Sequence, residues 1–218
     1  MPQVFPPAMN AVARSSIIAA VFLAGAATIA FGALYRSSFV TQVNNPRPQT
    51  VPFSHRQHVA GLGIDCRYCH TSVEDSAFAG IPPTETCMTC HSQVWTDAPV
   101  LEPVRRSWDT GKPLEWVRVH DLPEFVYFDH SIHVAKGVGC VTCHGRVDQM
   151  PLTWKANTLH MSWCLECHRA PEKFIRPRDQ ILSMEWQPDE PQATLGARLL
   201  EEYDIKVGQL TNCSVCHR

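Results

Sequence analysis

The chain has 218 residues, and its 10 cysteines and 11 histidines exceed the usual share of both residue types. This length accommodates one or two small domains. A single apolar stretch is long enough to span a bilayer, which excludes a polytopic transporter. The formal net charge of −2 excludes a general polyanion-binding protein, so we expect no nucleic-acid partner.

The first predicted element is an uncharged apolar segment, residues 15–35, between Arg14 and Arg36. As a helix it would extend about 31 Å, which matches the hydrocarbon core of a bilayer. A cleaved signal peptide is the rival interpretation, but its apolar region is usually only about 7–15 residues long. We therefore expect an uncleaved single-pass anchor over 15–35 in the cytoplasmic membrane, with a cytoplasmic N-terminus over 1–14.

Five copies of the pentad C-x-x-C-H, numbered here in chain order, account for every cysteine. In this motif the two cysteines form thioethers with a c-type haem, and the adjoining histidine is the proximal axial ligand of the iron. A zinc site, a disulfide framework or a thioredoxin-like motif does not require a histidine after the second cysteine in every copy. We therefore predict five covalently attached haem c groups. The thioether residues are Cys66, Cys69, Cys87, Cys90, Cys140, Cys143, Cys164, Cys167, Cys213 and Cys216, and the proximal ligands are His70, His91, His144, His168 and His217.

The motifs divide the rest of the chain into modules. Residues 36–52 form a linker rich in Pro and Asn, 53–94 a di-haem module, 95–127 a connecting loop without cysteine, and 128–218 a tri-haem module. Arg105, Arg106 and Arg118 of the connecting loop are candidates for contact with haem propionates or with a partner protein. The expected fold is a multihaem cytochrome c, with short α-helices and irregular loops packed around five haems and one N-terminal transmembrane helix. A short amphipathic helix is predicted over 191–203.

Six further histidines supply candidates for the second axial ligand that a low-spin haem needs. Two pairs occur in the repeated pattern F-x-H-x-x-H, which precedes the first and the third motif. Histidines at i and i+3 lie on one helical face, so each can reach a different iron. A chance H-x-x-H or a two-histidine zinc site is the alternative. The six are His55, His58, His120, His130, His133 and His160.

F-x-H-x-x-H followed by C-x-x-C-H resembles the small periplasmic multihaem cytochromes c, in which the first histidine caps the next haem and the second caps a later one. The resemblance implies five distal ligands: His55 for the first motif, His58 for the second, His130 for the third, His133 for the fourth and His160 for the fifth. His120 is then left over, as an alternative ligand, a propionate partner or a titrating surface group. Met88 and Met161 are the alternative sulfur ligands if one haem is His/Met.

The segments FSHRQHVAGLGIDCRYCH (53–70) and VYFDHSIHVAKGVGCVTCH (126–144) resemble the pentahaem cytochrome subunit of alternative complex III, a bacterial quinol:electron-acceptor oxidoreductase. The resemblance covers most of residues 50–170 and the N-terminal helix. It implies a subunit docked on an iron–sulfur subunit and on membrane-spanning quinol-oxidising subunits. It further implies electron delivery to a monohaem cytochrome c, a blue-copper protein or an oxidase. Because haem is attached to c-type cytochromes outside the cytoplasm, the haem domain belongs on the periplasmic face.

Electron transfer within a respiratory or photosynthetic complex is thus the predicted function, with no catalytic residue in the chain itself. A stand-alone, membrane-anchored quinol dehydrogenase is the first alternative, since one helix plus a haem domain is compatible with it. A multihaem reductase of nitrite, sulfite or a similar oxyanion is the second. Such a reductase needs a haem with an open axial position, whereas the histidines here suffice to saturate every iron.

Overall fold

The computed structural model of the chain describes residues 6–217 and divides the protein into two compact units, Met1–Val43 and Asn44–Arg218. Residues 1–5 of the expected cytoplasmic N-terminus and residue 218 of the expected tri-haem module lie outside the described residues.

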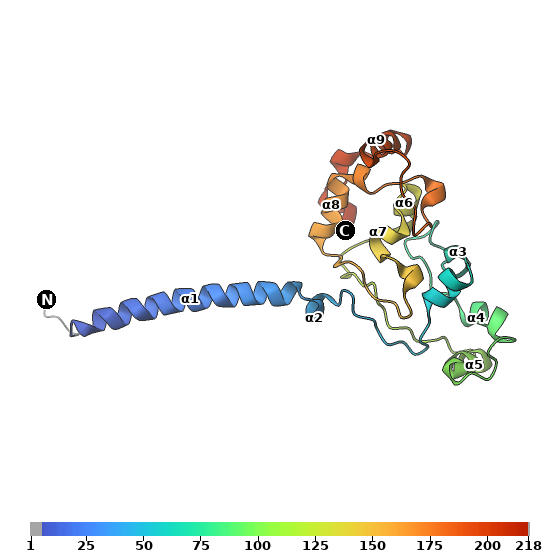
Figure 1. The fold of residues 1–218 in the computed structure, drawn as a ribbon, viewed down its shortest axis with the longest axis horizontal. Coiled ribbons are helices and arrows are strands. Elements are labelled where there is room, and N and C mark those ends of the chain that lie inside the picture. Colours follow the sequence, from blue (N-terminus) through green and yellow to red (C-terminus); the bar gives the residue numbers. More distant parts are fainter. Residues whose placement is uncertain (1–5, 218) are drawn as a thin grey trace. The chain divides into compact units, whose positions relative to one another are not determined.

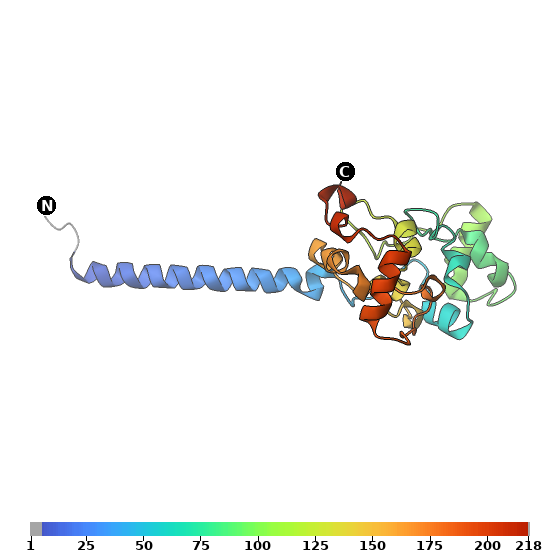
Figure 2. The same ribbon diagram turned by 90° about the horizontal axis from the view of Figure 1, so that it is seen from above.

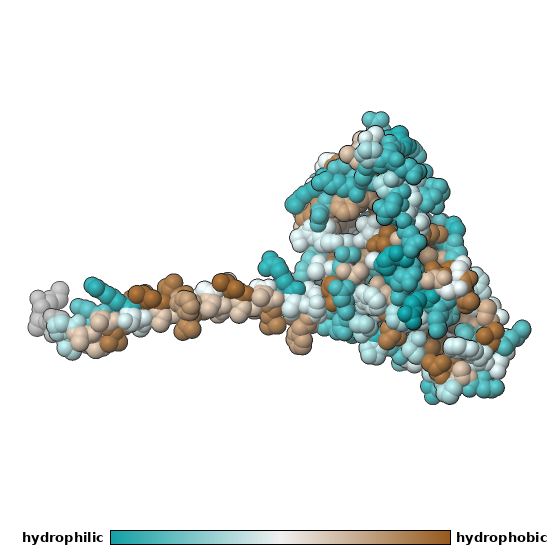
Figure 3. All heavy atoms as spheres, in the orientation of Figure 1, coloured by the Kyte–Doolittle hydropathy of each residue, from teal (hydrophilic) through white to brown (hydrophobic). Residues whose placement is uncertain are grey.

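The first unit consists of the long helix α1 (Ala8–Arg36) and the single turn α2 (Ser38–Thr41). Helix α1 starts directly after Pro7, whose fixed backbone angle favours a helix start, and ends where Ser37 becomes extended. None of its residues is buried, and its exposed apolar side chains include Phe22 and Ile29. Figure 3 shows hydrophobic surface along this helix. The expected helix over 15–35 is therefore confirmed within a longer helix that could cross a membrane, a property that anchors and signal sequences share.

Short helices surround the five motifs in the second unit, as expected. One helical turn separates the two cysteines of each motif, so both thiols lie on the same helical face. The motif helices are α3 (Cys66–Cys69), α4 (Thr84–His91), α7 (Cys140–His144), α8 (Met161–Arg169) and α10 (Cys213–Cys216).

The remaining elements are also short, and residues 6–217 contain no strand, although Val138 and Ile175 form an isolated antiparallel bridge. The amphipathic helix predicted over 191–203 is confirmed as α9 (Gln192–Glu202). The other helices are η1 (Arg56–Gly61, a π-helical segment), α5 (Glu102–Thr110) and α6 (His130–Ala135). The 3₁₀ turns are η2 (Pro99–Leu101), η3 (Val147–Gln149), η4 (Pro171–Lys173), η5 (Arg178–Gln180) and η6 (Val207–Gln209).

Two small apolar clusters form the polypeptide core of the second unit. One gathers Ile175 with Leu195, Leu199 and Tyr203 from α9 and the residue after it, and the other gathers Val51 with Leu101 and Val104. Helices α4 and α5 lie at one end of this unit and α8 and α9 at the other, with α7 between them (Figures 1 and 2). The third motif, on α7, therefore occupies the middle of the unit.

Candidate haem-binding sites

Four imidazole pairs stand out among the described side chains. In each pair, one ring follows a C-x-x-C motif and the other belongs to an F-x-H-x-x-H segment. The ring centroids are 6.5 Å apart for His55 and His70, 6.2 Å for His58 and His91, 6.4 Å for His130 and His144, and 6.1 Å for His133 and His168. These are the same pairs that the resemblance to small multihaem cytochromes implies.

The separations fit two imidazoles that share one metal ion. Each bond from a histidine nitrogen to a transition metal measures about 2 Å, and each ring nitrogen lies about 1 Å from its ring centre. Two ligands on opposite sides of one ion would therefore have centroids about 6 Å apart. His130 and His144 also face each other with an interplanar angle of 12°, and His55 and His70 with one of 11°.

Hydrogen bonds at Nδ1 hold most of these imidazoles in one orientation. A carbonyl oxygen only accepts, so a ring whose Nδ1 contacts a carbonyl keeps its proton there and leaves Nε2 available to a metal. The Nδ1–carbonyl contacts are His58–Ser54 (2.9 Å), His70–Gly80 (2.7 Å), His91–Val94 (3.1 Å), His130–Ala77 (2.8 Å), His133–Asp129 (2.6 Å), His168–Leu210 (2.9 Å) and His217–Phe125 (3.0 Å). His55 Nδ1 lies instead 3.1 Å from the hydroxyl oxygen of Thr153.

The aromatic residue of F-x-H-x-x-H positions both histidines of its segment. The Phe53 ring lies edge-on to His55 at 5.0 Å and stacks on His58 at 4.4 Å. The Phe128 ring repeats this with its two histidines, edge-on at 4.8 Å and stacked at 4.6 Å. The backbone differs, since the first segment forms the π-helical η1 and the second the α-helical α6. The repeated F-x-H-x-x-H pattern predicts the histidine pairs, but we did not predict from it that the two phenylalanines support them.

Burial lowers the pKa of two of these histidines, His55 and His144. Burial and then the charges of His70 and His58 lower the pKa of His55 to about 4. Burial, with smaller contributions from His120 and His130, lowers the pKa of His144 to about 3. A metal-binding imidazole must be unprotonated at the binding nitrogen, so these environments favour the ligand form at neutral pH.

The fifth motif and the two remaining histidines are arranged differently. His217 stacks against Phe125 with centroids 5.9 Å apart, in addition to its Nδ1 bond. His160 is the residue directly before α8, next to the fourth motif, and its role as distal ligand stays a prediction. His120 lies edge-on to His144 at 4.3 Å, and its buried Nε2 has no hydrogen-bond partner in the described part of the chain. It therefore lies beside the third motif and not at a separate site.

Hydrogen bonds join the motif sites in a definite order. The first and second are linked where the hydroxyls of Tyr68 on α3 and Thr89 on α4 lie 2.9 Å apart. The loop after the first motif binds α6, because Ala77 accepts from the backbone and ring of His130. Helix α6 supplies partners to the third and fourth motifs. A small cavity is lined by residues of both the fourth and the fifth motif, among them His168 and His217.

The cysteines of neighbouring motif sites also lie close to one another. Burial is the main cause of the raised pKa of four thiols, and the second cause is a thiol of the adjacent motif. These neighbouring pairs are Cys87 with Cys69, Cys140 with Cys66, Cys143 with Cys167 and Cys164 with Cys216. The motif sites thus follow one another as second, first, third, fourth and fifth.

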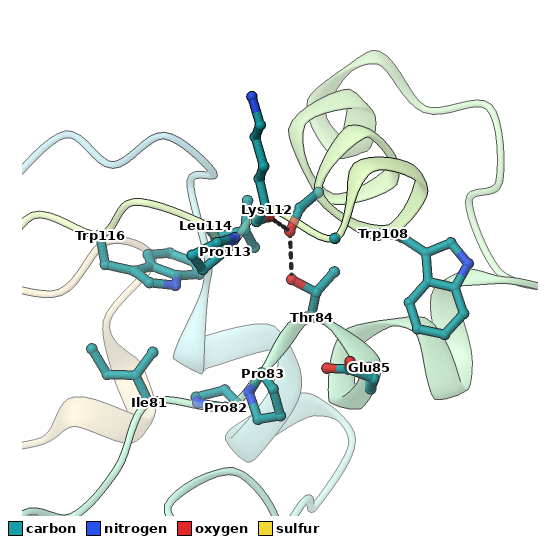
Figure 4. Close-up of a pocket in the computed structure, with 12 residues that line it drawn as sticks. Ile81, Pro82, Pro83, Thr84, Glu85, Trp108, Lys112, Pro113, Leu114 and Trp116 are labelled. Atoms are coloured by element: carbon teal, nitrogen blue, oxygen red, sulfur yellow. Dashed lines mark hydrogen bonds between the residues drawn. The ribbon is translucent and has the colours of Figure 1, made fainter.

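A cavity of about 470 Å³ lies beside α4 and is lined by that helix and by the segment around α5. Thr84 and Ser107 share a hydrogen bond of 2.6 Å, and Ser107 also donates to the Lys112 carbonyl at 2.6 Å. Figure 4 shows these bonds between the indoles of Trp108 and Trp116, which stand on opposite sides. The bonds fix the connecting segment against the helix that carries the second motif.

The alternatives for the cysteines have no support in residues 6–217. All ten cysteines are free there, so no disulfide framework is formed. No group of three or more His, Cys, Asp or Glu side chains within the described range is placed to hold a metal ion. A zinc cluster built from the C-x-x-C pairs is therefore not observed among these residues.

The C-terminal part of the chain is similar to a known protein family. Residues 126–218, which contain the third to fifth motifs, match the family model described as "Cytochrome c7 and related cytochrome c". This part of the chain is therefore similar to multihaem cytochromes c, proteins that carry covalently bound haem c.

One curated relative is 35% identical over 112 residues: the menaquinone reductase, multiheme cytochrome c subunit, of Nitratidesulfovibrio vulgaris (strain Hildenborough). The match covers 49% of this chain and 50% of that protein. The chain thus spans about half the length of the curated relative it matches.

Proposed function

We propose that this chain is a membrane-anchored pentahaem cytochrome c that passes electrons within a quinol-oxidising complex related to alternative complex III. The observation that carries the proposal is the set of four imidazole pairs with centroids 6.1–6.5 Å apart, each beside a C-x-x-C-H motif. When bound, each haem c supplies a one-electron iron couple whose potential the protein tunes.

The cysteines and histidines of the chain have different roles in binding the haems. The ten motif cysteines form the thioethers, and the motif histidines are the proximal ligands. His55, His58, His130, His133 and His160 are the distal ligands. The Nδ1 bonds fix the ring orientations of these histidines. Two histidines would be available to each haem iron, and a substrate would then have no free position to bind. This ligand set favours electron transfer over the reduction of an oxyanion.

The order of the motif sites supports transfer across the domain. The second motif, on α4, and the fifth, on α10, form the two ends of the series. Partner proteins exchange electrons at these ends: an iron–sulfur subunit on one side, and a monohaem cytochrome c, a blue-copper protein or an oxidase on the other. The exposed apolar helix α1 serves as the anchor beside the membrane-spanning quinol-oxidising subunits and leaves the haem domain on the periplasmic face.

Mild detergent extraction of the native membranes, followed by mass spectrometry of the intact assembly, tests this function. We expect a chain whose mass exceeds that of the polypeptide by five haems. It should copurify with an iron–sulfur protein and a protein with many apolar helices. A chain with fewer haems would contradict the pentahaem assignment. A fully loaded chain without these partners would contradict the proposed complex.

A stand-alone quinol dehydrogenase is the second candidate. The described residues contain one apolar helix that could cross a membrane, and a single helix joined to a haem domain favours this candidate. Reduction of the purified, isolated chain by a soluble quinol analogue distinguishes the two. We expect negligible reduction without the partner subunits, and rapid reduction would support the stand-alone enzyme.

A further inference from the structure

Arg176 is a buried cation that has no counter-ion among residues 6–217. Its residue is 8% exposed, and it follows Ile175 of the apolar cluster. Its backbone N–H donates to the Gly137 carbonyl at 2.8 Å. Removing a guanidinium from water is costly unless an anion or a full set of acceptors replaces the water. The surroundings of this side chain therefore indicate a missing partner.

The contacts of the guanidinium with residues 6–217 leave its Nε atom without a hydrogen-bond acceptor. Nη1 donates to the Ser183 carbonyl at 3.1 Å, and Cζ lies 4.9 Å from the centre of the Trp186 ring. Nε is buried and has no hydrogen-bond partner among residues 6–217. Within the same range Arg146 and Arg198 pair with carboxylates, whereas Arg176 forms no ion pair.

The Nε side of the Arg176 guanidinium lies next to the third motif. A Cβ added to Gly139, the residue before Cys140, would come within 2.5 Å of both Cζ and Nε of Arg176. The Cys140 backbone N–H donates to the Ile181 carbonyl at 3.1 Å, so the segment after Arg176 also holds the start of α7. Burial lowers the pKa of Arg176, and Cys140 is the group that opposes this.

We infer that Arg176 binds a haem propionate beside the third motif, through the buried Nε side of its guanidinium. The inference rests on the proposed haem attachment. A carboxylate matches the guanidinium fork, and such charge-assisted bonds are about twice as strong as neutral ones. The arginines expected from the sequence to take this role have other partners: Arg105 donates to the Thr96 carbonyl, Arg106 pairs with Glu102, and Arg118 pairs with Asp121.

The test compares full-length, detergent-solubilised holoprotein carrying Arg176→Met or Arg176→Lys. A cation near an iron disfavours the oxidised form, which has one more positive charge. Arg176→Met should shift one component of a spectroscopic redox titration to lower potential and leave the other four unchanged. Arg176→Lys should restore part of the shift. Arg178→Met is the matched control, because Arg178 lies on the same segment, is exposed and contacts Ala135 and Tyr203. It should titrate as the wild type.

Titrations of Arg176→Met and wild type that coincide, with only a lower melting temperature for the variant, would overturn the inference and leave Arg176 a structural residue. If Arg176→Met does not fold, an experimental structure of the wild-type holoprotein decides. A propionate oxygen within hydrogen-bond distance of Nε supports the inference and identifies the haem, and water or a protein acceptor there overturns it. Mass spectrometry separates the two proposals, since absence of haem at Cys140 and Cys143 contradicts the proposed function itself.

Discussion

At the scale of single residues, one hydrogen bond per ring decides which nitrogen a histidine offers. His70, His130 and His168 each contact a carbonyl oxygen outside their own helix through Nδ1. These carbonyls come from loops that carry no motif of their own. The loops thus set the orientation of each of these imidazoles, as outer partners of metal ligands do at other metal sites.

Replacing His160 by Met tests the distal ligand that is predicted for the fifth motif. A thioether ligand in place of an imidazole raises the potential of a haem. We expect one of the five components of a redox titration to move to higher potential, with the others unchanged. His120→Met is the control and should leave all axial ligands in place. The reverse outcome, a ligand change in the spectrum of His120→Met and none in His160→Met, would assign the fifth distal position to His120.

Thr153→Val tests the outer partner of His55, because valine keeps the shape and removes the hydroxyl that lies 3.1 Å from Nδ1. Loss of such a partner typically costs about 10–100-fold in metal affinity or activity at other sites. We expect an altered low-spin signal for one haem in electron paramagnetic resonance spectra. Thr153→Ser retains the hydroxyl and should match the wild type. Identical spectra for all three proteins would show that His55 is oriented by Phe53 and packing alone.

At the scale of elements, the short helices depend on close contacts rather than on their own stability, because isolated helices of this length are marginal in water. Helix α9 packs against η4 through Gly196, where an added Cβ would overlap the Glu172 carbonyl group. The apolar residues Leu195 and Leu199 of the same helix complete the cluster around Ile175. The C-terminal part of the domain is therefore held by a helix outside the motifs.

Gly196→Ala should lower the free energy of unfolding by about 1–3 kcal/mol, the usual cost of overpacking a tight contact. Denaturant unfolding of the holoprotein measures this difference. Gly208→Ala is the matched control, since nothing lies within 4 Å of the added methyl group at that position. We expect the control to remain within about 0.5 kcal/mol of the wild type. Equal stability of the two variants would mean that α9 moves readily away from η4.

Helix α1 is proposed to anchor the chain in the membrane. Replacing residues 1–36 with a cleavable secretion signal should yield a haem domain that is released from the membrane by osmotic shock. The full-length chain should require detergent, because its exposed apolar helix is long enough to span the bilayer. A shortened protein that still sediments with membranes in cells lacking the partner subunits would place the membrane contact in the haem domain.

The sequence predicted elements wherever a local pattern decides the structure. The apolar run yielded α1, the cysteine spacing yielded the motif helices, and the amphipathic pattern yielded α9. The π-helical form of η1 was not predictable, because its spacing of histidines is the same as that in α6. The burial of Arg176 and the position of His120 beside His144 were missed as well. Both depend on segments distant in the sequence that meet only in the folded chain.

At the scale of the whole domain, the order of the motif sites differs from their order in the chain. The second site comes before the first, and the third site is central to the series. This arrangement follows from the two F-x-H-x-x-H segments, each of which serves two neighbouring motifs. Both unpartnered buried nitrogens, on His120 and Arg176, also lie at the central site in the part that the structure describes. The potential at this site should therefore be the most sensitive to substitution.

The central claim is that all five irons carry two protein ligands. Electron paramagnetic resonance and absorption spectroscopy of the purified, full-length holoprotein, with the haem content determined by mass, test it most directly. The account predicts five haems per chain, only low-spin signals, and no spectral change on addition of cyanide, carbon monoxide or nitrite. A substantial high-spin signal that shifts when such a ligand binds would contradict it and would make substrate reduction at an open haem the better interpretation.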